Sequence, residues 1–89
     1  MDLKEVFEKL GIEDYADRIF KSNSHGELFH LQQYYELAKM GVNKEMFRKE
    51  FIKVVEHAEK NWERPESVFQ HILDVMVNMW VAEEIKINF

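Results

Sequence analysis

The chain has 89 residues, of which 46% are hydrophobic and 13% aromatic, and its formal net charge is −5. This length is typical of one domain, and the many aromatic side chains argue against a disordered segment. The acidic balance lacks the basic field that attracts proteins to phosphate backbones, so nucleic acid is not an expected partner. No cysteine is present, which excludes disulfides and thiolate metal ligands.

The N-terminal stretch MDLKEVFEKLG lacks the continuous apolar region of a signal peptide, so we expect a cytoplasmic protein in a reducing compartment. The same stretch predicts a short helix with one apolar face: Leu3, Val6, Phe7 and Leu10. A second short helix, in IEDYADRIF, carries an apolar stripe that is rotated away from the first: Ile12, Tyr15, Ile19 and Phe20. Gly11 lies between them and favours a left-handed cap, so the sequence predicts a corner there.

The loop KSNSHG precedes a third helical region. Ser24 and Glu27 form a capping box that opens it, and Gly41 ends it. The predicted core stripe of this region consists of Leu28, Leu31, Tyr34, Tyr35 and Ala38. The pattern leaves open whether residues 24–40 form one helix or two.

The clearest helical pattern covers residues 43–62. Asn43 is the expected N-cap, because its side chain can accept hydrogen bonds from the first backbone N–H groups. One continuous apolar stripe follows along this helix: Phe47, Phe51, Val54, Val55, Ala58 and Trp62. The stretch NWERPES, with the single proline, ends the helix.

The last predicted helix covers residues 65–85 and contains VFQHILDVMVNMW. The run is too short and too polar to span a membrane, which takes about 20 predominantly apolar residues. Its polar residues fall within about one quadrant and predict a single solvent-facing stripe: Gln70, His71, Asp74 and Asn78. The remaining apolar arc predicts a core spine. The alternative is a dimer seam with a second copy, which would include Val77, Met79, Trp80 and Val81.

These patterns together predict an all-α fold, a compact bundle of four to five helices with the last helix as its core spine. We expect one domain over residues 1–89, with a module at 1–62, an additional helix at 65–85 and a tail at 86–89.

Several stretches together resemble the sterile alpha motif (SAM) domain. VFEKLGIEDYADRIF resembles its start, and the positions that match are Val6, Phe7, Leu10, Gly11, Ile12, Tyr15, Ala16 and Phe20. GELFHL, YELAKMGV and FRKEFIKVV resemble later parts, so the resemblance covers roughly residues 1–58. It implies protein–protein association, in which an acidic mid-domain surface docks on the N-terminal end of the last SAM helix of another molecule.

The charges of the chain are compatible with this mode. The acidic candidates for partner binding lie in the middle of the module: Asp14, Asp17, Glu27 and Glu36. The basic candidates lie at the start of the 43–62 helix: Lys44, Arg48 and Lys49. Such opposite patches would join copies head to tail. Ordinary solvated helix charges are the other explanation.

A second function class is a DNA-binding regulator. ELAKMGVNKEMFRKEF resembles a helix-turn-helix, with Ala38, Gly41 and Val42 at the turn and the helix 43–62 as the recognition helix. The glutamates interleaved along that helix would repel phosphates, so we rank this alternative below protein binding.

No pattern predicts an enzyme, a cofactor, a metal site or a small-molecule substrate. Glu27 and His30 form half of a helical carboxylate–histidine metal motif, but the second copy is missing. His71 and Asp74 lack a nucleophile or third ligand.

Apolar contact is a further way to bind a partner. Phe29, Leu37 and Met40 fall opposite the core stripe of their helix, unless a bend near Leu31 brings them into the core. Because aromatic and methionine side chains are enriched at interfaces, we predict a candidate apolar interface at these residues: Phe29, Met40, Val77 and Trp80.

Overall fold

The structure contains only helices and their connections over the residues that it describes. The computed structural model describes residues 2–22 and 30–87. Its elements are α1 (Leu3–Lys9), a 3₁₀ helix (Glu13–Tyr15), α2 (Ala16–Ser22), α3 (Leu31–Lys39), α4 (Lys44–Asn61) and α5 (Glu66–Ile87). This confirms the predicted all-α bundle. In the described part, no helix is long and apolar enough to cross a membrane.

Side chains cap the N-termini of two helices, α1 and α4. The Asp2 carboxylate accepts a hydrogen bond from the backbone N–H of Glu5 at 2.9 Å and begins α1. The Asn43 side chain accepts from the backbone N–H groups of Glu45 and Met46, each at 3.1 Å, and begins α4. Asn43 is therefore the N-cap that the sequence predicted.

Two glycines provide the predicted turns. Gly11 has a φ of 76° and Gly41 a φ of 73°, both in the left-handed region where a glycine carries no penalty. Gly11 follows α1 and turns the chain into the 3₁₀ helix, which confirms the predicted corner. Gly41 follows α3 and precedes the cap of α4.

The third helical region does not run unbroken from 24 to 40. His30 has a φ of 56°, whereas a continuing helix requires a φ near −63°. α3 therefore begins at Leu31. The predicted capping box of Ser24 and Glu27 lies outside the described residues.

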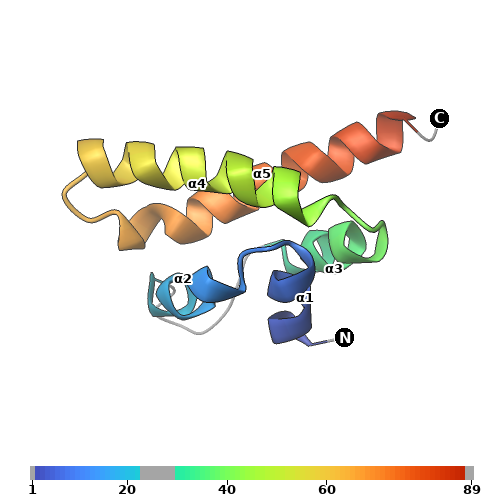
Figure 1. Cartoon of the computed structure of the whole chain (residues 1–89), viewed down its shortest axis with the longest axis horizontal. Coiled ribbons are helices and arrows are strands. Elements are labelled where there is room, and N and C mark those ends of the chain that lie inside the picture. Colours follow the sequence, from blue (N-terminus) through green and yellow to red (C-terminus); the bar gives the residue numbers. More distant parts are fainter. Residues whose placement is uncertain (1, 23–29, 88–89) are drawn as a thin grey trace.

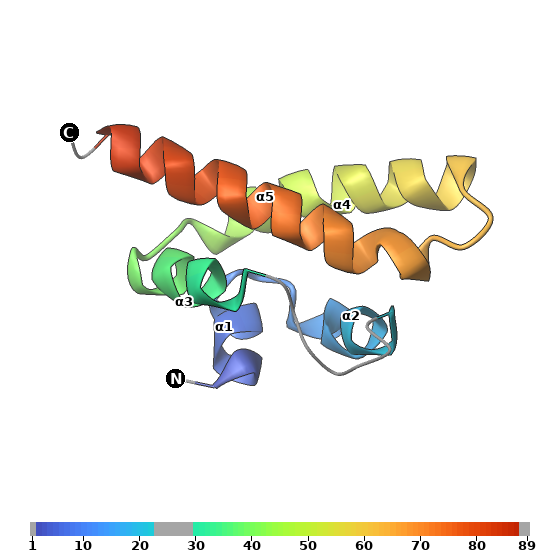
Figure 2. The ribbon, with the colours of Figure 1, turned by 180° about the vertical axis from the view of Figure 1, so that it is seen from behind.

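The helices form two layers (Figures 1 and 2). α4 and α5 make one layer, and α1, α2 and α3 make the other. The C-terminal end of α5 lies at the opposite end of the molecule from the α4–α5 connection. This helix extends to Ile87, so the predicted tail at 86–89 is helical over its first two residues.

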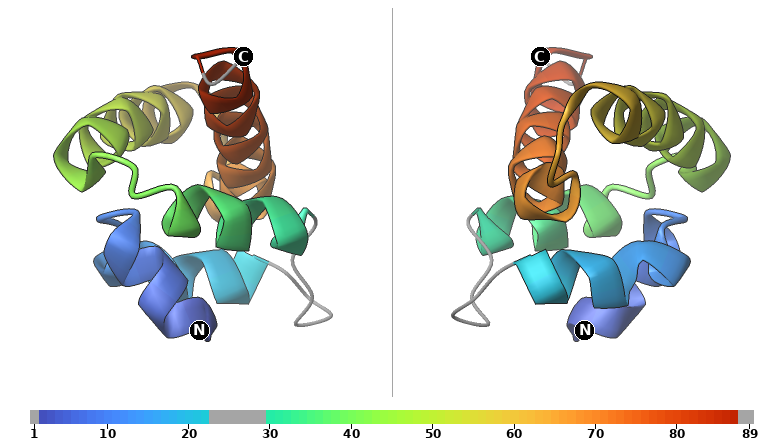
Figure 3. Two further views of the ribbon diagram at one scale, coloured as in Figure 1. Left: turned by 90° about the vertical axis from the view of Figure 1, so that its right-hand side faces the viewer. Right: turned by 90° about the vertical axis from the view of Figure 1, so that its left-hand side faces the viewer.

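α5 is the central element. It packs against α2, α3 and α4, and the end views show it above α2 and α3 with α4 at its side (Figure 3). Its buried side chains are drawn from most of its circumference: Phe69, Gln70, Ile72, Leu73, Asp74, Met76, Val77 and Val81. The predicted core spine is confirmed.

Aromatic side chains fill the space between the layers. The fully buried ones come from four helices: Phe7, Tyr34, Phe47, Phe51 and Phe69. Phe47 and Trp80 pack edge to face with 5.2 Å between their ring centroids, and Tyr15 and Phe51 do so at 5.3 Å. Such edge-to-face contacts add to the free energy of burial, which matters in a chain with so few layers.

The predicted apolar stripes are only partly correct. Leu37, expected opposite the core stripe, is fully buried, because α3 is packed between α1 and α5 and therefore has two covered faces. Other residues assigned to core stripes lie at helix ends or at the edges of the layers and stay exposed: Phe20, Leu31, Val54 and Trp62. Helical periodicity identifies residues that share a face, but the neighbouring helices decide how wide the covered face is.

Gly11 and Gly41 provide a matched test of this fold. A Cβ at position 11 would lie 2.6 Å from the backbone oxygen of Lys44, whereas a Cβ at position 41 would meet nothing within 4 Å. Gly41→Ala should lower the free energy of unfolding by about 1–2 kcal/mol through backbone strain alone. Gly11→Ala should cost roughly 1–3 kcal/mol more, because α1 and α4 must separate.

Urea unfolding of both variants measures the difference. Equal losses of stability in the two variants would contradict the close approach of the Gly11 corner to α4.

Candidate functional site

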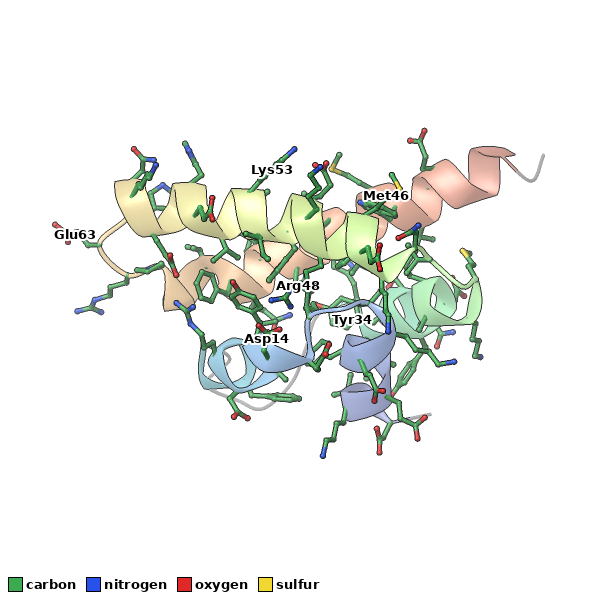
Figure 4. All side chains as sticks on the ribbon, viewed as in Figure 1. Asp14, Tyr34, Met46, Arg48, Lys53 and Glu63 are labelled. Carbon is green, nitrogen blue, oxygen red and sulfur yellow. The ribbon has the colours of Figure 1, made fainter. Side chains whose placement is uncertain are left out.

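Arg48 joins α4 to the corner at Gly11. Its guanidinium donates two hydrogen bonds to the Asp14 carboxylate, at 2.5 and 2.9 Å, and one to the carbonyl oxygen of Gly11 at 2.8 Å. Figure 4 shows Arg48 directed from α4 toward Asp14, whereas Met46 and Lys53 point to the other side of that helix. The hydrogen bond from Arg48 holds the pKa of Asp14 below its ordinary value.

This ion pair changes the interpretation of the predicted charge patches. Asp14 and Arg48 were expected on two surfaces that meet between molecules, but they bind each other within one chain. Substituting Arg48 would therefore disturb the fold as well as any association.

The other described candidates for partner binding are placed as follows: Asp17, Lys44 and Lys49 are exposed, and Glu36 is partly buried and accepts a hydrogen bond from Gln32. Glu27 lies outside the described residues.

A buried polar cluster connects α3 to α5. The Tyr34 hydroxyl donates to Asp74, and the Gln70 side-chain nitrogen lies 3.0 Å from both Asp74 Oδ1 and the Tyr34 oxygen. All three residues are buried. Burial raises the pKa of Asp74, although its hydrogen bonds from Tyr34 and Gln70 oppose the shift. Burial, together with Asp74, also raises the pKa of Tyr34.

The predicted solvent-facing stripe of α5 is therefore wrong for half of its members. Gln70 and Asp74 face α3, and Asn78 is partly buried, so only His71 is exposed. The helix is rotated relative to the expectation because Tyr34 supplies a buried hydroxyl for the polar pair. The sequence signal was present: a polar pair four residues apart in an apolar run needs a partner when the run is buried.

The same rotation turns apolar side chains of α5 outward. Val75 is 43% exposed and Met79 is 64% exposed. On α4, Met46 is 58% exposed and Val54 is 38% exposed. These four side chains line the seam between the two helices, and adjoining exposed apolar side chains of this size commonly mark an interaction site.

Two adjoining cavities occupy this seam, which we call the α4–α5 groove. Both are lined by Glu50, Met79 and Trp80. The first, of about 320 Å³, is completed by Val54, His71, Ile72, Val75 and Met76. The second, of about 370 Å³, is completed by Met46 and Glu83. The groove thus has an apolar floor and carboxylates at its rim.

The predicted apolar interface is only partly at the surface. Trp80 is partly buried and lines the groove, whereas Val77 is fully buried and cannot contact a partner. In the suggested dimer seam Val81 is buried as well, so Met79 is the member that is well exposed.

The two candidates outside α5 are not part of the groove as described. Met40 is 39% exposed but lies outside the groove. Phe29 lies outside the described residues. Sequence reasoning missed Met46 and Val75 as surface residues.

Two other sequence features, the half metal motif that includes His30 and the helix-turn-helix stretch, can be compared with the described residues. Nowhere in residues 2–22 and 30–87 do three His, Asp or Glu side chains gather so as to hold a metal ion. α4 packs on α5 through its apolar face and exposes Lys49 and Lys53 together with Glu45 and Glu56. This mixture of charges is a poor surface for phosphates.

Comparison with known proteins does not assign a family. The sequence matches no family model, and neither the curated proteins nor the solved structures include a significant match. The resemblance to SAM domains stays a prediction.

The two aspartates predict opposite responses to pH. The lowered pKa of Asp14 means that its contribution to stability is present above the unfolded value, about 3.9, and is lost as pH falls through the folded pKa. The raised pKa of Asp74 means that its contribution is fully present below that value and is lost as pH rises through the folded pKa. Asp14→Asn should therefore destabilise the protein at pH 7 by less than about 1 kcal/mol, because the pair is exposed. Asp74→Asn should stabilise it at pH 7.

Thermal unfolding between pH 3 and pH 8 tests both signs. The two variants should approach the wild type at the acidic end of this range. Because His30 and His71 lie near enough to Asp74 to lower its pKa, the Asp74→Asn profile should also be measured in a His71→Gln background. A loss of stability in Asp74→Asn at pH 7 would contradict a buried carboxylate with a raised pKa.

Proposed function

We propose that this chain is a non-enzymatic protein-binding module, and that it binds its partner in the α4–α5 groove. The observation that carries the proposal is the exposure of four large apolar side chains along one seam: Met46, Val54, Val75 and Met79. A protein of this size has little apolar material to spare, so leaving these side chains in water needs a reason. A partner that covers them provides one.

The shape of the groove favours a helical segment as the bound element. Two parallel ridges of side chains, one from α4 and one from α5, leave a trough between them, and an amphipathic helix fills such a trough with its apolar face. Methionine side chains suit this task, because they are flexible enough to adapt to different shapes. Met46 and Met79 stand on the two sides of the second cavity.

The resemblance to SAM domains supports the same class of function by a different surface. In that mode, the exposed charges of Asp17, Lys44 and Lys49 would join copies of the chain. The internal Asp14–Arg48 pair removes one member from each of the two patches, which is why we favour the groove. The helix-turn-helix alternative would use α4, whose exposed lysines are mixed with glutamates that repel phosphates.

A photo-crosslinking amino acid tests which surface binds. Placed at position 79 in cells of the native host, it should form a discrete adduct with a partner, and Met46→Glu across the groove should abolish that adduct. Met79 is well exposed, so the substitution should change stability by less than about 0.5 kcal/mol.

Position 40 is the matched control, since Met40 is an exposed methionine outside the groove. A crosslinker at position 17 samples the charged surface instead. Adducts at 17 but not at 79 would contradict the groove and favour the SAM mode.

A further inference from the structure

We propose, on the basis of the proposed function, that the α4–α5 groove takes a basic amphipathic helix of a partner protein, with Lys or Arg beside its apolar anchors. The groove combines an apolar floor with carboxylates at two places on its rim, Glu50 and Glu83. Among the described side chains, no Lys or Arg lines either cavity, and His71 at one end is the only basic residue type there. Charge complementarity therefore selects a cationic partner.

The two cavities determine the spacing of the anchors. The first cavity lies along α5 between His71 and Trp80, and the second lies between Met79 and Glu83. Their centres are about five residues apart along the helix, or roughly 8 Å at 1.5 Å per residue. A bound helix would place one apolar side chain in each cavity with anchors one to two turns apart.

The second cavity is where the basic residue of the partner would lie. Its lining combines Met46, Met79 and Trp80 with the two glutamates. The aliphatic stem of a Lys or Arg side chain can cover the methionines while its charged end reaches a carboxylate. Glu50 is available for this role, because its contact with Lys53 is long, at 3.8 Å, and both side chains are more than half exposed.

A second copy of this chain fits the groove less well. Its basic helix face, Lys49, Ile52 and Lys53, carries one apolar side chain and would leave the other cavity uncovered. In a two-fold antiparallel pairing of α4–α5 layers, Glu50, which lines both cavities, would face its own copy. A parallel pairing would bring the two Glu83 side chains together. Like charges across an interface oppose binding.

The test uses three helical peptides with the same apolar anchors and with flanking Lys/Arg, Gln or Glu. The full chain carries Trp62→Phe, so that Trp80 in the groove is the only tryptophan and reports binding by fluorescence. Two exposed ion pairs should make the basic peptide bind about tenfold tighter than the Gln peptide at low salt. The Glu peptide should bind most weakly, and 1 M salt should remove the differences.

Variants locate the effect. Glu50→Gln and Glu83→Gln should each reduce the preference for the basic peptide, while Glu56→Gln, an exposed glutamate on the other side of α4, should leave it unchanged. Met79→Glu should weaken all three peptides. This last result separates the apolar contribution of the groove from its charge.

The outcomes separate the two proposals. Equal binding of the basic and Gln peptides would overturn the charge inference and leave the groove as a binding site. Failure of all three peptides to bind would overturn the groove as well. Sedimentation that shows a dimer lost in Met79→Glu would identify a second copy as the occupant, which would also overturn the inference.

Discussion

The packing of α5 against three other helices is the constraint on which the rest of the structure depends. An 89-residue chain has few ways to bury enough apolar surface, and here one helix supplies much of the core. Such a helix can carry polar groups on its buried arc only where a neighbour satisfies them. The Tyr34 hydroxyl on α3 does so for Asp74 and for the side-chain nitrogen of Gln70, whereas the side-chain oxygen of Gln70 has no partner among the described residues. The contact with Tyr34 sets the rotation of α5 about its own axis.

The exposed apolar seam follows from that rotation. With Asp74 turned toward α3, the side chains on the far side of the helix, Val75 and Met79, turn toward solvent beside α4. Met46 and Glu50 come from the edge of α4 that borders the same seam, one turn apart. The buried polar cluster and the α4–α5 groove are thus two consequences of one helix orientation.

The local features of this fold were predictable from sequence, and the orientation of its helices was not. The cap at Asn43 and the left-handed turn at Gly11 depend on neighbouring residues of the sequence, so both could be inferred from a few residues. The close approach of Gly11 to Lys44 on α4 could not. The rotation of α5 depends on Tyr34, which lies 40 positions before Asp74. Asp14 and Arg48 are 34 positions apart in the sequence. Each residue, taken alone, has the sequence pattern of an ordinary solvent-exposed charge on a helix. A helical wheel shows which residues share a face, but it does not tell which face a distant helix will cover.

Two residues of α5 depart from the pattern that favours a stable monomer: Asp74 is a buried carboxylate, and Met79 is an exposed methionine. Burying a carboxylate costs free energy even when it accepts hydrogen bonds, and exposing a methionine forgoes the gain from burial. Departures of this kind from the pattern that favours stability tend to collect at functional sites. Here they lie on opposite sides of one helix, and the groove is the side that a partner can reach. Among the described side chains, no Lys or Arg lines that groove, and the contact of Glu50 with Lys53 is long at 3.8 Å, so the acidic rim is available for recognition.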